Sequence, residues 1–347
     1  MQNLLLKLTL VFAAFLFALG FSANVFSTEK NIAKDTSKPI NVKVFIGAMF
    51  EIGNNSGDKA GEFQFWFERY FANSKPITVK GAANSVYCNQ NGVCGSVLGM
   101  GKVASSSSMQ AIILNKQFDV SKAYFLISGV AGTPPSKGTI ADVSWGSWLI
   151  DYDLGHRWHP SEGEPDAPTF TPRKGYESIR RYQLNAHLLN WALHISDDVK
   201  LTDSESARQY RQRYPQTAAR RKPKVGYGTH MTGDTFFHGP GLSSEAQYMA
   251  ELYGADDYVI TEMEAAAIAQ VLDRTLGINR MMSLRGAVNF DQGHPNERTL
   301  DHLDPAPGET AGGFEETLIN ISAVGAKVVD HIVENWHVWQ HDVPPLP

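Results

Sequence analysis

The sequence predicts an α/β fold in which helices cover both faces of a mostly parallel central sheet. Strand-like segments alternate along the chain with segments of helical periodicity, an order that is typical of parallel sheets. Apart from Lys43 and Lys122, segments such as 42–50 and 122–132 are largely apolar, as expected for strands that are buried on both faces. The chain has 347 residues, of which 43% are hydrophobic and 19% are charged. This globular balance is sufficient for one large domain.

The first half of the chain contains turn-forming glycines between its periodic segments. Glycines at 99 and 101 mark a turn before a helix. The predicted elements of this half are, in order, a strand at 42–50, a Gly/Asn-rich loop at 54–61, a helix at 62–71, a helix from about 103, a strand at 122–132 and two strand-like stretches within 139–154.

The second half begins with a region that we interpret as a helical insertion at about 153–223. A stretch rich in Pro, Gly, His and Arg at 153–177 precedes a segment of helical periodicity at 177–195. After it we expect, in order, strand and turn at 224–239, strand then helix at 257–277, a strand at 280–288 and a long helix from Gly313. The whole corresponds to a single domain at 40–341, followed by a short tail at 342–347.

The N-terminus has the pattern of a secretory signal. Lys7 precedes an uncharged run that reaches Phe21, and small residues follow it. A retained membrane anchor is the alternative, although Ser22, Asn24 and Ser27 dilute the run. We predict a signal peptide at 1–23, a flexible segment at 24–39, and an exported protein that is periplasmic or extracellular.

Two cysteines flank a turn-forming sequence in "VYCNQNGVCGSV". In an exported chain, Cys88 and Cys94 are expected to form a disulfide across a hairpin. A reduced, inert pair is the alternative reading.

The net charge and the spacing of the histidines argue against two kinds of ligand, nucleic acid and zinc. The net charge of −5 does not favour nucleic acid, and the basic group at 220–224 is interpreted as a solvated linker. The histidines at 156, 159, 294 and 302 lack the spacing of a zinc site, so no metal is predicted.

A carboxylate pair ends one apolar strand in "VITEMEAAAIAQVL", residues 259–272. Glu262 and Glu264 fall at the strand end, the edge where α/β sheets bind ligands, and an alanine-rich helix follows. Read alone, a glutamate in the position of Glu264 is more often a favourable charge at a helix N-terminus.

Five segments together resemble the nucleoside phosphorylases and 5'-methylthioadenosine nucleosidases, in the same order along the chain. They are "IGAMF" at 46–50, "GMGKVASS" at 99–106, "GVAGTPPSKGTIADV" at 129–143, "TGDTFFHG" at 232–239 and "LRGAVN" at 284–289, beside the "EMEAAA" motif at 262–267. A closer resemblance, through "GEFQFWFER", the paired cysteines and "LRGAVNFDQ", is to the purine nucleoside permease family. The resemblance implies a nucleoside phosphorylase-like fold and a site for a purine nucleoside.

The resemblance also implies roles for single residues. The implied ribose-binding residues are Met49, Met263 and Glu264, and the implied base-binding residues are Phe236, Phe237 and Asn289. The implied nucleophile or anion loop comprises Ser128, Gly129, Val130 and Gly132. The implied catalytic residues are Glu62, Arg285, Asn289 and Asp291. The alternatives are structural roles, in which the phenylalanines are core residues and Arg285 pairs with a buried carboxylate.

The chemistry of N-glycosidic cleavage suits these residue types. Glu62 is the first candidate for the general base that activates water, and Glu51 is the second. Asn289 would hydrogen-bond the departing purine, with Asp291 as the alternative acid. By the same resemblance, Val130 stands where nucleosidases have a serine and Ile127 where bacterial phosphorylases have a phosphate-binding arginine. Neither side chain can donate a hydrogen bond to an anion.

We therefore predict an exported protein that binds purine nucleosides and hydrolyses their N-glycosidic bond. Non-catalytic capture of nucleosides for transport, and phosphorolysis, are the alternatives. No cofactor is expected, and phosphate is a potential co-substrate that the residues do not favour. Inosine and guanosine are expected to be preferred over adenosine as ligands. A membrane protein for uptake is a potential partner, and the protein could also form a homo-oligomer.

Overall fold

The computed structural model describes residues 38–165, 167–303 and 311–346. The predicted signal peptide at 1–23 and most of the segment at 24–39 lie outside the described residues. Among the residues it describes, no helix is both long enough and apolar enough to cross a membrane.

A nine-stranded mixed sheet forms the centre of the fold. Five of its strand pairs are parallel and four are antiparallel. The predicted mostly parallel sheet is therefore not confirmed, whereas the mixed α/β class is. The strands are β2 (Val44–Ala48), β3 (Tyr87–Cys88), β4 (Val93–Val97), β6 (Tyr124–Thr133), β7 (Val143–Asp151), β10 (Arg181–Gln183), β11 (Val225–Thr232), β12 (Tyr258–Glu262) and β13 (Met281–Phe290).

Five of these strands close into a ring that contains both parallel and antiparallel pairs. The cycle runs from β7 through β11, β12, β6 and β13 back to β7. β13 is parallel to β6 and antiparallel to β7. A register shift between Ala287 and Asn289 interrupts the β13 ladder near its carboxyl end, as bulges do where a strand bends.

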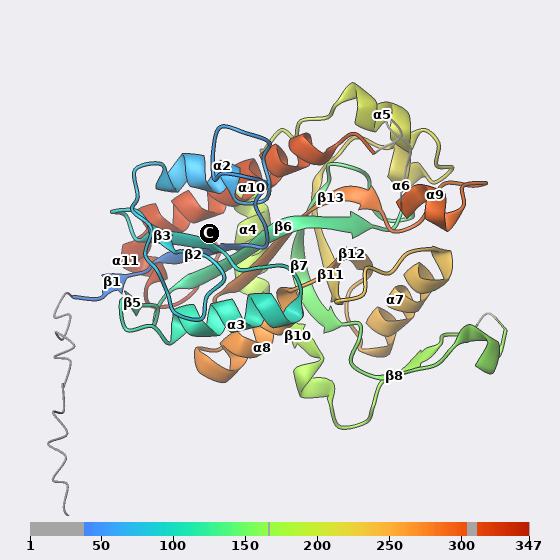
Figure 1. Cartoon of the computed structure of the whole chain (residues 1–347), viewed down its shortest axis with the longest axis horizontal. Coiled ribbons are helices and arrows are strands. Elements are labelled where there is room, and N and C mark those ends of the chain that lie inside the picture. Colours follow the sequence, from blue (N-terminus) through green and yellow to red (C-terminus); the bar gives the residue numbers. More distant parts are fainter. Residues whose placement is uncertain (1–37, 166, 304–310, 347) are drawn as a thin grey trace, which may run out of the picture. The chain divides into compact units, whose positions relative to one another are not determined.

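Helices pack on both sides of this sheet (Figure 1). On one side, α3 (Lys102–Ile113) packs against α8 (Ala265–Thr275), and α8 also contacts β7 and β11. On the other side, α10 (Phe314–Glu334) lies along β13 and contacts α4 (Ala186–Ser196) and α2 (Gln64–Trp66). Two large clusters of buried apolar residues fill these two layers, as the amphipathic pattern of the helices requires.

The region at 153–223 contains short strands as well as helices. β8 (His156–Arg157) and β9 (Phe170–Thr171) form a separate two-stranded hairpin. The helix expected at 177–195 begins only at Ala186, because Asn185 accepts hydrogen bonds from the first amides of α4 and so caps it. β10 and a short turn occupy the preceding residues. The remaining elements here are a 3-10 turn at Pro160–Glu162, α5 (Glu205–Arg211) and α6 (Thr217–Arg220).

Three other parts of the fold complete it. α2 continues into a π-type turn, Phe67–Phe71, where one helix was expected. β1 (Ile40–Asn41) and β5 (Phe118–Asp119) form a small parallel pair. α7 (Pro240–Leu252), α9 (Thr299–Leu303) and α11 (Trp336–Trp339) were not predicted from the sequence.

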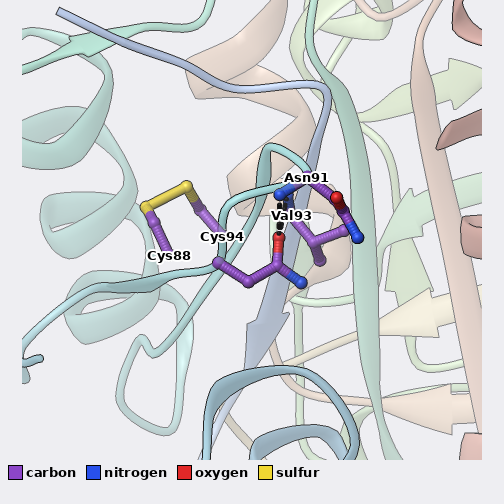
Figure 2. Close-up of a disulfide and its surroundings, with 5 residues drawn as sticks. Cys88, Asn91, Val93 and Cys94 are labelled. Atoms are coloured by element: carbon purple, nitrogen blue, oxygen red, sulfur yellow. Dashed lines mark hydrogen bonds between the residues drawn. A yellow bond between two sulfur atoms is a disulfide. The ribbon is translucent and has the colours of Figure 1, made fainter. Parts of the chain in front are cut away.

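The disulfide between Cys88 and Cys94 is present and joins β3 to β4 (Figure 2). The side chain of Asn89 shapes the connecting turn by accepting hydrogen bonds from the amides of Asn91 and Val93. Gly92 has a φ of 84°, a conformation that glycine adopts without steric cost. The turn residues between the cysteines thus fold as the sequence predicts.

Candidate active site

Arg285 is the centre of a buried charged cluster between the middle of β13 and the carboxyl end of β12. Its Nη2 lies 2.7 Å from Oε2 of Glu262 and 3.1 Å from Oε2 of Glu264. Only 1% of the residue is exposed. Burial alone would lower the pKa of Arg285, but the two carboxylates raise it overall, so the guanidinium stays charged.

Glu62 approaches the same cluster from the start of α2. Its Oε1 accepts a hydrogen bond of 2.7 Å from the amide of Val130, and its Oε2 accepts one of 2.7 Å from the amide of Met49. Burial raises the pKa of Glu62 to about 7, against the opposing charge of Arg285. A carboxyl group that titrates near neutrality is suited to general-base chemistry.

Gly129 on β6 leaves space for both Glu62 and Arg285 beside it. The pairing of β6 with β13 places Gly129 directly opposite Arg285. A methyl group at position 129 would lie 2.5 Å from Oε1 of Glu62 and 2.7 Å from Nη1 of Arg285. Any larger residue would therefore displace one of these two charged groups.

Glu264 links the cluster to α3. It stands immediately before α8 and is 3% exposed. Its Oε1 accepts a hydrogen bond of 2.9 Å from the amide of Gly101, the residue that precedes α3. Burial raises the pKa of Glu264, while Arg285 opposes the shift. Glu264, which is predicted to bind ribose, thus lies in the same cluster as Glu62, the predicted general base.

Glu262 is also part of the site, although the sequence predicted no role for it. Its Oε2 accepts hydrogen bonds of 2.8 Å from the amides of Glu264 and Ala265, and its Oε1 accepts one from the hydroxyl of Thr232. Glu262 therefore caps α8 and orients Arg285, which is the helix-terminus role considered for Glu264. Its position at the strand end, in the same motif, was the available signal.

The predicted base-binding aromatics have different environments. Phe236 is 55% exposed, in the loop between β11 and α7. Phe237 is buried, and its ring stacks on Tyr152 with a centroid separation of 4.5 Å and packs against Tyr258. Of the two, Phe236 has the ring that is available to stack on a ligand.

Asn289 and Asp291 also differ in their surroundings. The Nδ2 of Asn289 donates to the carbonyl of Phe290 at 2.8 Å, and Asn289 lines a pocket of about 600 Å³ together with Lys59. Asp291 is 1% exposed and accepts a hydrogen bond of 2.9 Å from the hydroxyl of Tyr258. Burial raises the pKa of Asp291 to about 6. Asn289 is therefore the more accessible of the two.

The predicted loop residues contribute backbone rather than side-chain groups. The amide of Val130 binds Glu62, while the hydroxyl of Ser128 is buried and has no hydrogen-bond partner within the described part of the chain. A methyl group at Gly132 would lie 3.1 Å from Nδ2 of Asn289, so this glycine gives the amide its space. Met49 is buried in the core and Met263 is half-buried beside Glu264.

The structure therefore brings Glu62, Glu264 and Arg285 together around Gly129, and it places Glu51 outside this cluster. The carboxylate of Glu51 instead accepts backbone amides of its own loop. In the described ranges, no group of three or more His, Cys, Asp or Glu side chains is arranged to hold a metal ion.

Solved structures show the class of fold. The chain is similar to futalosine hydrolase of Helicobacter pylori, with a TM-score of 0.54 and 16% identity, over 84% of this chain and 98% of that one. It is also similar to the 5'-methylthioadenosine/S-adenosyl homocysteine nucleosidase of Campylobacter jejuni, with a TM-score of 0.52 and 19% identity, over 85% of this chain and 99% of that one. The fold is that of the nucleoside phosphorylases and nucleosidases.

The family follows from the sequence as a whole. Residues 41–344 match the family described as purine nucleoside permease, and the chain belongs to this family. A "Probable purine nucleoside permease" of Schizosaccharomyces pombe is 28% identical over 86% of this chain and 90% of its own length. A "Purine nucleoside permease" of Candida albicans is 27% identical over 89% of this chain and 80% of its own length.

Proposed function

We propose that this protein binds purine nucleosides and hydrolyses their N-glycosidic bond. The observation that carries the proposal is the convergence of Glu62, Glu264 and Arg285 around Gly129. The names of the relatives and of the structural neighbours support a nucleoside or a related purine compound as the ligand.

In the proposed reaction, Glu62 accepts a proton from a water molecule whose oxygen attacks the anomeric carbon. The electron pair of the broken C–N bond passes to the purine, where a nitrogen takes up a proton from solvent, and Glu62 later returns its own proton to solvent. Glu264 binds the ribose hydroxyls and orients the sugar. Phe236 stacks on the base, and Asn289 donates a hydrogen bond to it as negative charge develops.

The electrostatics of the cluster favour water over phosphate as the nucleophile. The amide of Val130 and the guanidinium of Arg285 are the donors that an anion would need, and carboxylates already accept from both. A phosphate dianion placed beside Glu62 would be repelled by it. The apolar side chains of Ile127 and Val130 cannot compensate for this repulsion.

Incubation of inosine with the protein, with and without phosphate, tests the proposal. Chromatography should show free hypoxanthine and ribose in both cases, at equal rates. Glu62→Gln is the matched variant and should abolish release while leaving the fold intact by circular dichroism. Ribose 1-phosphate as the product would establish phosphorolysis instead.

Non-catalytic capture for transport is a second candidate, since the relatives carry the name permease. In that case calorimetry would detect inosine binding but chromatography would detect no free base. Export, with removal of residues 1–23, and a membrane uptake partner belong to both versions of the proposal. Sequencing the N-terminus of the secreted product tests export, and an intact Met1 in a membrane fraction would contradict it.

A further inference from the structure

Glu51 and Glu62 enclose a glycine-rich surface loop, residues 52–61. The Oε1 atom of Glu51 accepts a hydrogen bond of 2.8 Å from the amide of Ile52 and a second from the amide of Gly61. Its Oε2 accepts a hydrogen bond of 2.9 Å from the amide of Phe63. One carboxylate thus joins the two ends of the loop.

Two of these three amides belong to the residues on either side of Glu62. The amide of Glu62 itself donates to the carbonyl of Phe50 at 3.1 Å. A methyl group at Gly61 would lie 2.6 Å from Oε1 of Glu51 and 2.7 Å from its Cα. The close approach of Glu51 to the backbone therefore depends on glycine at position 61.

The rest of the loop offers Glu62 little other support. The carboxylate of Asp58 accepts hydrogen bonds only within the loop, from the amide and the side chain of Asn54, while its backbone carbonyl accepts one of 3.5 Å from Nε2 of Gln64. Asn55 donates to the hydroxyl of Tyr87 at 3.1 Å. Most residues between Ile52 and Gly61 are exposed, and a flexible loop does not by itself hold its ends in one geometry.

We infer that Glu51 is a positioning residue, which fixes the backbone on both sides of Glu62 and so directs its carboxylate at the amides of Met49 and Val130. This inference rests on the proposed function for its catalytic meaning. The position of the Glu62 carboxyl, which Glu51 is inferred to fix, can be measured without any reaction.

Burial links the position of Glu62 to its acidity. Because burial is the main cause that raises the pKa of Glu62 to about 7, movement of its carboxyl towards water should lower the pKa towards the ordinary value of 4.5. A variant that loosens the loop ends should therefore change the titration of Glu62.

Glu51→Gln and Gly61→Ala disturb the same contact from opposite sides, and Asp58→Asn is the matched control in the same loop. The titration of Glu62 is followed by carbon-13 NMR with labelled glutamate, and Glu62→Gln assigns its signal. We expect both test variants to lower the pKa of Glu62 and to lower kcat for inosine cleavage about tenfold or more, with KM near that of the wild type. Asp58→Asn should resemble the wild type in all three measurements.

The outcomes separate this inference from the proposed function. If the wild type does not cleave inosine, the proposed hydrolysis fails, and the Glu62 titration still decides the role of Glu51. A wild-type titration in both test variants overturns the inference, and so does an equal effect of Asp58→Asn. If Glu51→Gln does not fold, Gly61→Ala alone decides between the same two results.

Discussion

At the scale of single residues, the balance of charge around Arg285 determines the chemistry of the cluster. One guanidinium stands among the carboxylates of Glu62, Glu262 and Glu264, all nearly inaccessible to solvent. Burial disfavours the charged forms of Glu62 and Glu264, and Arg285 compensates only part of that cost. Proton binding near neutral pH is the consequence, and it connects activity with stability.

The pH dependence of both properties follows from Glu62. Its pKa is about 7 in the folded protein against an ordinary 4.5, so the folded state holds a proton that the unfolded state loses between these values. This group's contribution to stability is fully present below pH 4.5 and is lost as the pH rises through 7. The rate of cleavage should instead rise with pH, because Glu62 must be ionised to act as the general base.

Thermal melting of the wild type and of Glu62→Gln between pH 5 and pH 8 checks this prediction. The wild type should lose more stability than the variant as the pH rises, while the wild-type cleavage rate should increase up to about pH 7. Parallel stability curves would show that Glu62 is ionised throughout this range.

Glu264→Gln should lower the affinity for inosine about tenfold or more. The change removes the charge from a charge-assisted hydrogen bond to the ribose hydroxyls, an interaction worth roughly 1.5–3 kcal/mol. Calorimetry measures the affinity, and Glu251→Gln, an exposed change on α7, is the control. An unchanged affinity in a folded variant would remove Glu264 from the ribose site.

Asn289→Asp should shift the preference from inosine towards adenosine. A protonated carboxyl can donate to a purine nitrogen and then release its proton, whereas an amide can donate but keeps its proton. Asp291→Asn should leave the preference nearly unchanged, since Asp291 is buried against Tyr258. The ratio of inosine to adenosine turnover, measured for both variants, tests this prediction. A shift in the Asp291 variant alone would mean that Asp291, and not Asn289, recognises the purine.

At the scale of elements, one carboxylate on α7 holds the β8–β9 hairpin to the body of the fold. Glu245 is 3% exposed and accepts hydrogen bonds from the hydroxyl of Tyr152, the guanidinium of Arg157, and the amide and hydroxyl of Thr169. The ring of Tyr152 in turn stacks on Phe237, next to Phe236. The hairpin is thereby linked to the loop that carries the predicted base-stacking residue.

Glu245→Ala should lower the free energy of unfolding by about 2–3 kcal/mol, because it leaves buried donors without a partner. Denaturant unfolding measures the loss, and the exposed Glu251→Ala on the same helix should change it by no more than about 0.5 kcal/mol. A loss of equal size in both variants would mean that the hydrogen bonds of Glu245 are not the cause.

At the scale of the whole molecule, local patterns predicted elements better than they predicted their assembly. The apolar runs of β2, β6, β12 and β13 were recognisable because burial on both faces leaves a continuous signal. The antiparallel contact of β13 with β7 left no such signal, since it depends on strand curvature and on residues far apart in the sequence. The mixed sheet was missed for this reason.

The residues of the candidate site also differ in how well the sequence alone could predict them. Glu264 and Arg285 were recognisable from motifs of a few residues. The choice between Glu62 and Glu51 depended on how a ten-residue loop folds back on itself, and spacing alone left both open. Glu262 was overlooked because its partners, Thr232 and Arg285, come from other strands.

The ring of five strands also limits how copies of this protein can associate wrongly. A strand with neighbours on both sides has no free backbone groups to offer to another chain, and exposed sheet edges are the usual starting points of aggregation. In the described part of the chain, the nine-stranded sheet ends at β10 and β3, which have three and two residues. The disulfide holds the second of these in place. A foreign strand would find much less to pair with there than the roughly five or six residues of an average strand.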